Sequence, residues 1–180
     1  MGVLKGTDLE KRFAQHPVVK GVTLQVAQGE VVGLLGPNGA GKTTTFYMLV
    51  GIIGANKGRI EAAGRDVTHW PLHQRARFGL SYLPQESSVF RKLSVRENME
   101  IILEYTGLSR KEQRSRRDRL MHELGIAGLA EQRAVSLSGG ERRRLEIARA
   151  LIRDPLFMLL DEPFAGIDPL AVDDIQSNIR

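Results

Sequence analysis

The first third of the chain combines short apolar segments with glycine-rich turns. Apolar and polar residues alternate in V-T-L-Q-V (22–26), which predicts a strand with one buried face. The continuous apolar run V-V-G-L-L (31–35) predicts a strand buried on both faces, as in a parallel sheet. The loop G-P-N-G-A-G-K (36–42) follows it and leads into a helix expected over 44–50. A further short hairpin is expected around 59–67.

The rest of the chain is mainly helical in pattern. Residues 95–153 are rich in arginine and glutamate, with apolar positions at helical spacing. P-L-F-M-L-L (155–160) predicts a second buried strand. D-E-P (161–163) follows, and its proline would end the strand. L-A-V-D-D-I-Q-S-N-I (170–179) predicts the start of a last helix. This order of elements predicts an α/β layer fold with a helical insertion.

Composition narrows the class of protein. A chain of 180 residues, 42% apolar and 26% charged, is typical of one globular domain. The absence of cysteine excludes a disulfide framework, a thiolate metal site and a cysteine nucleophile. The longest uncharged apolar run, residues 46–55, is half the roughly 20 residues that cross a bilayer. The first ten residues lack the apolar core of a signal peptide.

The net charge of +5 owes much to R-K-E-Q-R-S-R-R-D-R (110–119). Such a cluster could bind nucleic acid or an anionic membrane, or could be the solvated face of a helix. Glu112 and Asp118 interrupt it, and no aromatic residue lies between the arginines for base stacking. We therefore favour the solvated face and expect no nucleic-acid partner.

Residues 36–43 match the phosphate-binding pattern G-x-x-x-x-G-K-[ST]. Glycines allow backbone N–H groups to point at phosphate oxygens, and the helix that begins here directs its positive end toward them. Lys42 adds a charge near the β and γ phosphates, and Thr43 offers a hydroxyl to Mg²⁺. A ligand-free glycine turn is the alternative, but the expected strand before the loop and helix after it favour phosphate binding. The dinucleotide pattern G-x-G-x-x-G fails at Thr44.

Asp161 and Glu162 directly follow the strand expected over 155–160. An aspartate at a strand end can hold Mg²⁺. Because strand side chains alternate, Glu162 should face another group, and could orient and polarise a water for in-line attack on a γ-phosphate. Two solvated acids at a strand end are the alternative interpretation, which an upstream phosphate loop disfavours.

With these motifs the chain resembles the ATP-binding subunits of ABC transporters. G-P-N-G-A-G-K-T-T resembles their Walker A loop, L-S-G-G-E their signature, and L-F-M-L-L-D-E-P their Walker B strand with its glutamate. The resemblance implies a P-loop NTPase core with an N-terminal antiparallel β subdomain and an inserted helical subdomain. Residues 1–85 and 154–180 would form the catalytic core, and 86–153 the helical subdomain with the signature.

The resemblance also implies an ATP site with Mg²⁺. The nucleotide would be held by Phe13, Val18, Gly36, Pro37, Asn38, Gly39, Ala40, Gly41, Lys42, Thr43 and Thr44. Phe13 would stack on adenine, although an ordinary core aromatic is the alternative. Gln85 of Y-L-P-Q-E matches the family's Q-loop glutamine, and would join Thr43 and Asp161 around the metal. Lys42, Gln85 and Glu162 are the expected catalytic residues.

The signature suggests a site shared by two subunits. Ser138 and Glu141 have the S-x-x-E spacing of a capping box, so the serine could simply cap the helix. That interpretation does not need Gly139 and Gly140, whereas a bare helix start lets a phosphate approach closely. By resemblance these residues and Asp168, in the D-loop A-G-I-D-P, would contact the ATP of the other subunit in a homodimer.

The resemblance extends to the ATPase subunits of lipopolysaccharide export machines of Gram-negative bacteria. It rests on strings such as G-K-T-T-T-F-Y-M, L-P-Q-E-S-S-V-F-R-K-L-S-V and S-L-S-G-G-E-R-R-R. It implies a peripheral protein on the cytoplasmic face of the inner membrane, with Phe90 and Arg91 lining a groove for coupling helices of integral membrane subunits. A core position for Phe90 is the alternative.

Three other functions remain open. The chain could be the ATPase of a branched-chain amino-acid importer, or a soluble ABC protein, although it shows neither a second ATPase domain nor a long coiled-coil insertion. It could also bind ATP without hydrolysing it. The family has a switch histidine after Walker B, whereas His16, His69, His73 and His122 all precede Glu162. We therefore expect a C-terminally truncated copy of the domain, which puts turnover by this chain in doubt.

Overall fold

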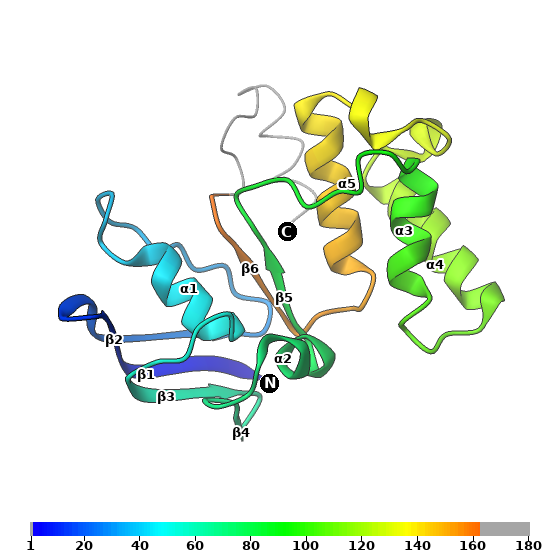
Figure 1. Ribbon diagram of the computed structural model, residues 1–180. Helices are drawn as coiled ribbons and strands as arrows, with labels where there is room; N and C mark the ends of the chain where they lie inside the picture. Colours follow the sequence, from blue (N-terminus) through cyan, green and yellow to red (C-terminus); the bar gives the residue numbers. More distant parts are fainter. Residues whose placement is uncertain (1, 163–180) are drawn as a thin grey trace. The chain divides into compact units, whose positions relative to one another are not determined.

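The computed structural model describes residues 2–162, so the helix expected over 170–179 and the D-loop Asp168 lie outside the described part. The chain divides into two compact units (Figure 1). Of the described residues, the first consists of 2–81 and 156–159, and the second of 82–155 and 160–162.

The first unit is built on an antiparallel sheet. Its strands are β1 (Val3–Phe13), β2 (His16–Ala27), β3 (Lys57–Ala62) and β4 (Arg65–Asp66), in the order β2-β1-β3-β4. Each neighbouring pair is antiparallel. The strand predicted over 22–26 and the hairpin predicted around 59–67 are therefore confirmed, as is the antiparallel β subdomain.

Helix α1 (Lys42–Val50) lies against this sheet, and α2 (Leu72–Phe78) follows in the same unit (Figure 1). The helix predicted over 44–50 is confirmed. Its last three residues, Met48 to Val50, are almost completely buried, together with Leu9 and Ile60 of the sheet. Burial of such apolar side chains, at about 25 cal/mol per Å² removed from water, is what holds α1 to the sheet.

Arg75 fastens the two helices of this unit together. Its side chain is 1% exposed, and its guanidinium donates to the carbonyl oxygens of Met48 (2.6 Å) and Leu49 (2.7 Å) at the end of α1. It also donates to Trp70 O and Thr68 O, both at 2.9 Å. Burial lowers the pKa of Arg75 to about 10, so the side chain remains charged at neutral pH.

The prediction of a strand over residues 31–35 is wrong. These residues form no strand, and Val31, Val32 and Leu35 are 79%, 47% and 92% exposed. A strand needs a neighbouring edge for its backbone groups and a layer over its side chains, and an apolar composition supplies neither. Within residues 2–162 no strand pairs with this segment. The phosphate loop thus follows an irregular segment.

Strands β5 (Leu80–Leu83) and β6 (Phe157–Leu160) form a separate two-stranded sheet. The strand predicted over 155–160 is therefore confirmed, at its C-terminal four residues. The amide of Leu156 donates to Gly79 O, and that of Asp161 to Leu83 O. The residue numbers rise on both strands from the first bond to the second, so the two strands run parallel.

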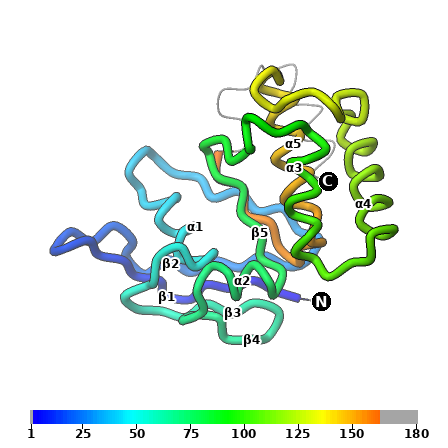
Figure 2. The backbone as a smooth tube through the Cα atoms, turned by 45° about the vertical axis from the view of Figure 1, so that its right-hand side comes forward, coloured from blue at the N-terminus to red at the C-terminus, as the bar shows by residue number. Residues whose placement is uncertain are grey.

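The second unit is helical, as the pattern over 95–153 predicts. Its helices α3 (Val95–Leu103), α4 (Arg110–Glu123) and α5 (Gly139–Leu151) lie side by side in both views (Figures 1 and 2). Two short 3₁₀ turns, Ala127–Leu129 and Ala134–Ser136, connect α4 to α5. The core between the helices is a single apolar cluster that includes Met99, Leu103, Leu120, Leu145 and Ile152.

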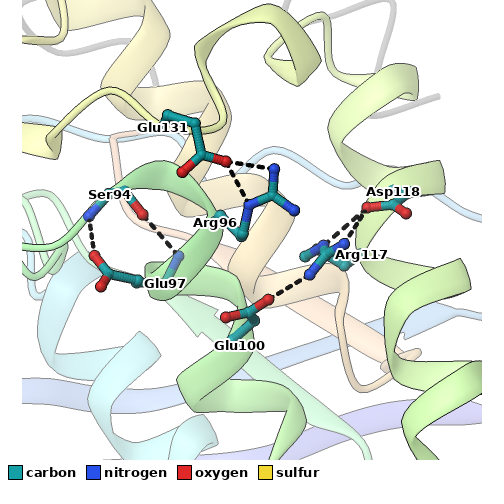
Figure 3. A network of polar contacts seen from close by, with 7 residues as sticks. All are labelled: Ser94, Arg96, Glu97, Glu100, Arg117, Asp118 and Glu131. Atoms are coloured by element: carbon teal, nitrogen blue, oxygen red, sulfur yellow. Dashed lines mark hydrogen bonds and ion pairs between the residues drawn. The ribbon is translucent and has the colours of Figure 1, made fainter.

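Each of these three helices begins with a capping box. Ser94, Ser109 and Ser138 accept from the backbone N–H three residues on, and Glu97, Glu112 and Glu141 accept from the serine N–H. Two of the N–H groups left unbonded at every helix start are satisfied in this way. Figure 3 shows the box of α3.

The arginine-rich stretch 110–119 forms α4, and most of its charged residues are exposed, as expected for a solvated face. Arg117 is the most buried of them, because it is 7% exposed and pairs with Glu100 of α3 and with Asp118 (Figure 3). On the surface, Arg96 pairs with Glu131 (Figure 3). Arg116 donates to Leu151 O of α5 at 3.4 Å, so two arginines of the cluster join α4 to neighbouring helices. No helix within residues 2–162 is long and apolar enough to cross a membrane.

Candidate functional site

The phosphate loop ends in a helix start that no side chain caps. Gly41 is the N-cap of α1, in a left-handed conformation with φ of 84°, and makes no side-chain capping bond. The hydroxyl of Thr45 donates to the carbonyl oxygen of Gly41, four residues earlier, at 2.9 Å. The helix therefore begins at a glycine, where backbone N–H groups and the positive end of the helix are suited to an anion.

The position of Gly41 has no room for a side chain. A Cβ at this position would lie 2.7 Å from Val18 O and 3.0 Å from Val19 Cγ2. Strand β2 therefore backs directly onto the loop, with the Val18 carbonyl next to Gly41. A positive φ and this close approach together leave room for glycine alone.

The Lys42 ammonium lies across the loop. Its Nζ donates to Gly36 O at 2.6 Å and to Pro37 O at 2.9 Å. The charge is thus held over the span of backbone that would surround a phosphate. Thr43 is exposed and Thr44 is half-buried at the first turn of α1. Residues 36–41 thus form the loop, and Lys42 to Thr44 the first turn of α1.

Phe13 ends β1 at the edge of the same unit. Its ring is 49% exposed, with Lys11 Nζ 5.5 Å from the centroid. The core alternative for Phe13 is therefore wrong. An exposed ring with a cation beside it is suited to stacking on a flat, electron-rich ligand.

The acidic pair occupies two environments in the second unit. Asp161 is 6% exposed, and Tyr82 Oη donates to its Oδ2 at 3.3 Å. Glu162 is exposed, has a φ of 45°, and accepts a bond from Gln85 Nε2 to its Oε2 at 2.9 Å. Neighbouring carboxylates are thus held by different partners, as the alternation along the strand predicts.

The chemistry of the proposed metal ligands fits Mg²⁺. The hydroxyl of Thr43, the amide oxygen of Gln85 and the carboxylate of Asp161 are hard oxygen ligands, which this cation prefers, usually together with waters and phosphate oxygens. Because Gln85 Nε2 donates to Glu162, its amide oxygen is the atom directed to other partners.

The signature helix α5 begins directly at Gly139, with Ser138 as its N-cap. The capping box is confirmed: Ser138 N donates to Glu141 Oε2 at 2.8 Å, and Glu141 N to Ser138 Oγ at 3.3 Å. The bonds from Ser138 backbone and side chain lower the pKa of Glu141. The box accounts for the serine and the glutamate, while Gly139 and Gly140 present bare backbone in the first turn.

Phe90 belongs to the surface of the helical unit. Its ring is 46% exposed and the guanidinium of Arg149 lies 5.0 Å from the ring centroid. The core alternative for Phe90 is therefore wrong. Asn98, fully buried, holds the backbone of Phe90 by accepting from its N–H and donating to its carbonyl. The exposed Arg91 follows, and its carbonyl accepts from Val135 N at 2.9 Å.

Sequence reasoning missed three groups around these residues: Tyr82 on Asp161, Arg75 at the end of α1, and the charged pair Arg143–Glu146 in α5. Of these three, only the burial of the Arg143–Glu146 pair could have been predicted from the sequence. Arg143 and Glu146 lie three apart and on the side of α5 that carries Ile147, whereas free surface charges would lie opposite the apolar stripe.

A family model described as "ABC transporter" matches residues 19–165. The chain is 54% identical over 179 residues to a probable ABC transporter ATP-binding protein of Azorhizobium caulinodans, covering 99% of this chain and 64% of that protein. It is 54% identical over 178 residues to the lipopolysaccharide export system ATP-binding protein LptB of Acidithiobacillus ferridurans (99% and 74% covered), and 52% identical over 181 residues to that of Escherichia coli K12 (100% and 75%). The chain thus spans between about two thirds and three quarters of the length of these relatives.

Solved structures give the same picture. An ATP-binding cassette of an ABC transporter in its ADP conformation matches with a TM-score of 0.85 and 27% identity, over 99% of this chain and 76% of that one. A nucleotide-free ATP-binding cassette of an ABC transporter matches with a TM-score of 0.86 and 25% identity, over the same shares of the two chains. The α/β fold and the inserted helices are those of this type of domain.

Proposed function

Because the chain belongs to the ABC transporter family, we propose that it is the ATP-hydrolysing motor subunit of a transporter that exports lipopolysaccharide. The observation that carries the catalytic part is the pair formed by Gln85 and Glu162 beside the buried Asp161. A glutamate held in place yet exposed can accept a hydrogen bond from an attacking water, while its buried neighbour is kept for a cation.

In this proposal the nucleotide is bound by the first unit. The adenine stacks on the exposed Phe13 beside Val18, and the phosphates meet the N–H groups from Gly36 to Thr44. Lys42 exchanges its carbonyl partners for the β and γ phosphates, which offer it a stronger, charge-assisted bond. Thr43, Gln85 and Asp161 would hold Mg²⁺, whose positive charge would offset the charge that develops on the phosphates.

Hydrolysis then depends on Glu162. Water attacks the γ-phosphorus in line with the bond to the leaving oxygen of ADP, and Glu162 orients and polarises that water. The bond from Gln85 Nε2 keeps the carboxylate in one position, so little reorganisation is needed when the water reacts.

The same proposal makes the site bipartite. The bare start of α5, with Ser138, Gly139 and Gly140, is suited to meet the γ-phosphate of ATP held by a second copy, and Asp168 would contribute from its D-loop. A homodimer with two ATP molecules between the subunits follows. Phe90 and Arg91, on the surface of the helical unit, would receive the coupling helices of integral membrane subunits on the cytoplasmic face of the inner membrane.

The lipopolysaccharide cargo is supported by the identity of 52 to 54% with LptB proteins. A complementation experiment tests it. The gene is expressed in a Gram-negative strain depleted of its own export ATPase, and lipopolysaccharide reaching the outer membrane is measured. We expect export and growth to be restored. A protein that hydrolyses ATP, fails to rescue, and copurifies with amino-acid importer subunits would make the cargo assignment wrong.

A further inference from the structure

Helix α5 carries a buried ion pair that the proposed chemistry does not use. Arg143 Nη1 and Glu146 Oε2 lie 2.8 Å apart, with side chains 7% and 3% exposed. Removing two charges from water is costly, so a buried pair is weak evidence for stability, and apolar residues often serve as well. The role of this pair therefore lies in the groups that Arg143 and Glu146 hold in position, rather than in stability.

Both members of the pair hold the same segment of backbone. Arg143 Nη1 donates to Pro84 O at 2.9 Å, and Glu146 Oε1 accepts from Ser88 N at 3.1 Å. One turn along the helix, Arg149 Nη1 donates to Ser88 O at 2.6 Å. We call these three side chains the α5 clamp.

The clamped segment has no regular structure of its own. Residues 84–90 run from the end of β5 without helix or strand, so no ladder of backbone bonds determines their path. Gln85, Glu86 and Ser88 are exposed. Between Pro84 and Ser88, the position of the segment is thus determined largely by side chains of α5.

Gln85 lies between the two clamped residues, one position after Pro84. The Gln85 side-chain amide donates to Glu162 at 2.9 Å. This bond forms only while the backbone of Gln85 keeps its position. The other end of α5 begins at Ser138. One rigid helix therefore connects the signature with the backbone that carries Gln85.

We infer that Glu146, paired with Arg143, is a positioning residue that sets Gln85 against Glu162. This inference rests on the proposed function, in which Gln85 and Glu162 act in ATP hydrolysis. Glu146 is 4% exposed and acts through the amide of Ser88. Because the clamp is part of α5, a movement of the signature helix also moves Gln85.

A double-mutant cycle tests the inference. Glu146→Ala, Gln85→Ala and the double variant are compared in the purified protein for kcat, KM and ATP affinity. We expect Glu146→Ala to lower kcat roughly ten- to a hundredfold through misplacement, with ATP affinity unchanged because the phosphate loop is not involved. In the Gln85→Ala background Glu146→Ala should add almost nothing. Glu146→Gln keeps an oxygen for Ser88 N and should recover most of the rate.

One outcome of the cycle overturns the inference. Effects of Glu146→Ala and Gln85→Ala that multiply would show that Glu146 does not act through Gln85. The matched control is Glu131→Gln, which removes an exposed carboxylate from its pair with Arg96 and should leave kcat unchanged. A parental protein that binds ATP without turnover would instead refute the proposed function.

Hydrogen exchange gives a second, turnover-independent test. The Ser88 amide should exchange faster in Glu146→Ala than in the parental protein, because its acceptor is gone. Where that variant does not fold, Arg143→Met with Glu146→Leu removes both charges and leaves no buried charge alone. It should show the same faster exchange. An unchanged Ser88 amide in a folded variant would refute the clamp.

Discussion

Gln85 and Glu162 are joined by a hydrogen bond of 2.9 Å, from the side-chain amide of one to the carboxylate of the other, across 77 residues of sequence. Glutamine cannot act as a base, whereas the carboxylate can. Gln85 therefore positions the carboxylate, and Glu162 acts on the water. Substitution of one residue or the other tests the two roles independently.

Glu162→Gln removes the charge but keeps an oxygen for Gln85 Nε2. We expect ATP binding to persist, ATP hydrolysis to fall by at least about a hundredfold, and an ATP-bound dimer to accumulate. Phosphate release and size-exclusion chromatography with ATP measure these effects. Glu123→Gln, on the exposed face of α4, is the control and should behave as the parental protein. Parental turnover in Glu162→Gln would exclude the role given to this carboxylate.

Lys42→Ala removes the ammonium that lies over the phosphate loop. A charge-assisted bond contributes about 1.5–3 kcal/mol, so ATP affinity should fall by roughly ten- to a hundredfold while the fold persists. A fluorescent ATP analogue measures the loss. Lys57→Ala is the matched control, since this lysine pairs with Glu10 on the sheet surface. Equal affinity in the two variants would argue against Lys42 as a phosphate ligand.

Gly41→Ala introduces a Cβ 2.7 Å from Val18 O at a positive φ. We expect the free energy of unfolding to fall by about 2–4 kcal/mol, the sum of left-handed strain of about 1–2 kcal/mol and a displaced strand. Gly29→Ala has almost the same φ, 83°, with nothing within 4 Å, and should lose the strain contribution alone. Urea denaturation of both variants separates the two causes; equal losses would mean that β2 gives way freely.

The three capping boxes predict a response to acid. Hydrogen bonds from Ser94, Ser109 and Ser138 lower the pKa values of Glu97, Glu112 and Glu141. A carboxyl whose pKa is lower in the folded state stabilises the fold above its unfolded pKa, and that contribution is lost as the pH falls through the folded value. Stability should therefore decline below about pH 4.5.

The variant with all three glutamates changed to glutamine isolates this contribution. Glutamine can complete the box but does not titrate. Its melting temperature should depend less on pH between about 5 and 3 than that of the parental protein. Identical pH profiles would show that the caps do not set the acid response.

Arg75→Met should destabilise the first unit. It leaves carbonyl oxygens of Met48, Leu49, Trp70 and Thr68 without their donor, and each buried unsatisfied acceptor costs about 1–3 kcal/mol before relaxation. We expect a total loss of roughly 3–5 kcal/mol in chemical denaturation. Arg77→Met on the same helix is the control, because its side chain is not part of this network. A loss below 1 kcal/mol would mean that water replaces the guanidinium.

Local chemistry was readable in the sequence. The helix after the phosphate loop, the strand before the acidic pair and the box at Ser138 each follow from a few neighbouring residues, and the structure confirms them. The segment 31–35 was not readable, because an apolar run becomes a strand only when a partner edge is available. Buried charges were also missed: Arg75 and Glu146 look like surface residues until the backbone groups that they bind are known.

The repeated serine and glutamate at the helix starts also bear on the order of folding. A capping box needs only four consecutive residues, so it can form before any distant contact exists. Helix nucleation is the costly step, and a box lowers that cost in each of α3, α4 and α5. The starts of α3, α4 and α5 are therefore expected to gain structure early in the refolding chain, before the contacts that join Pro84 and Ser88 to α5 across about sixty residues.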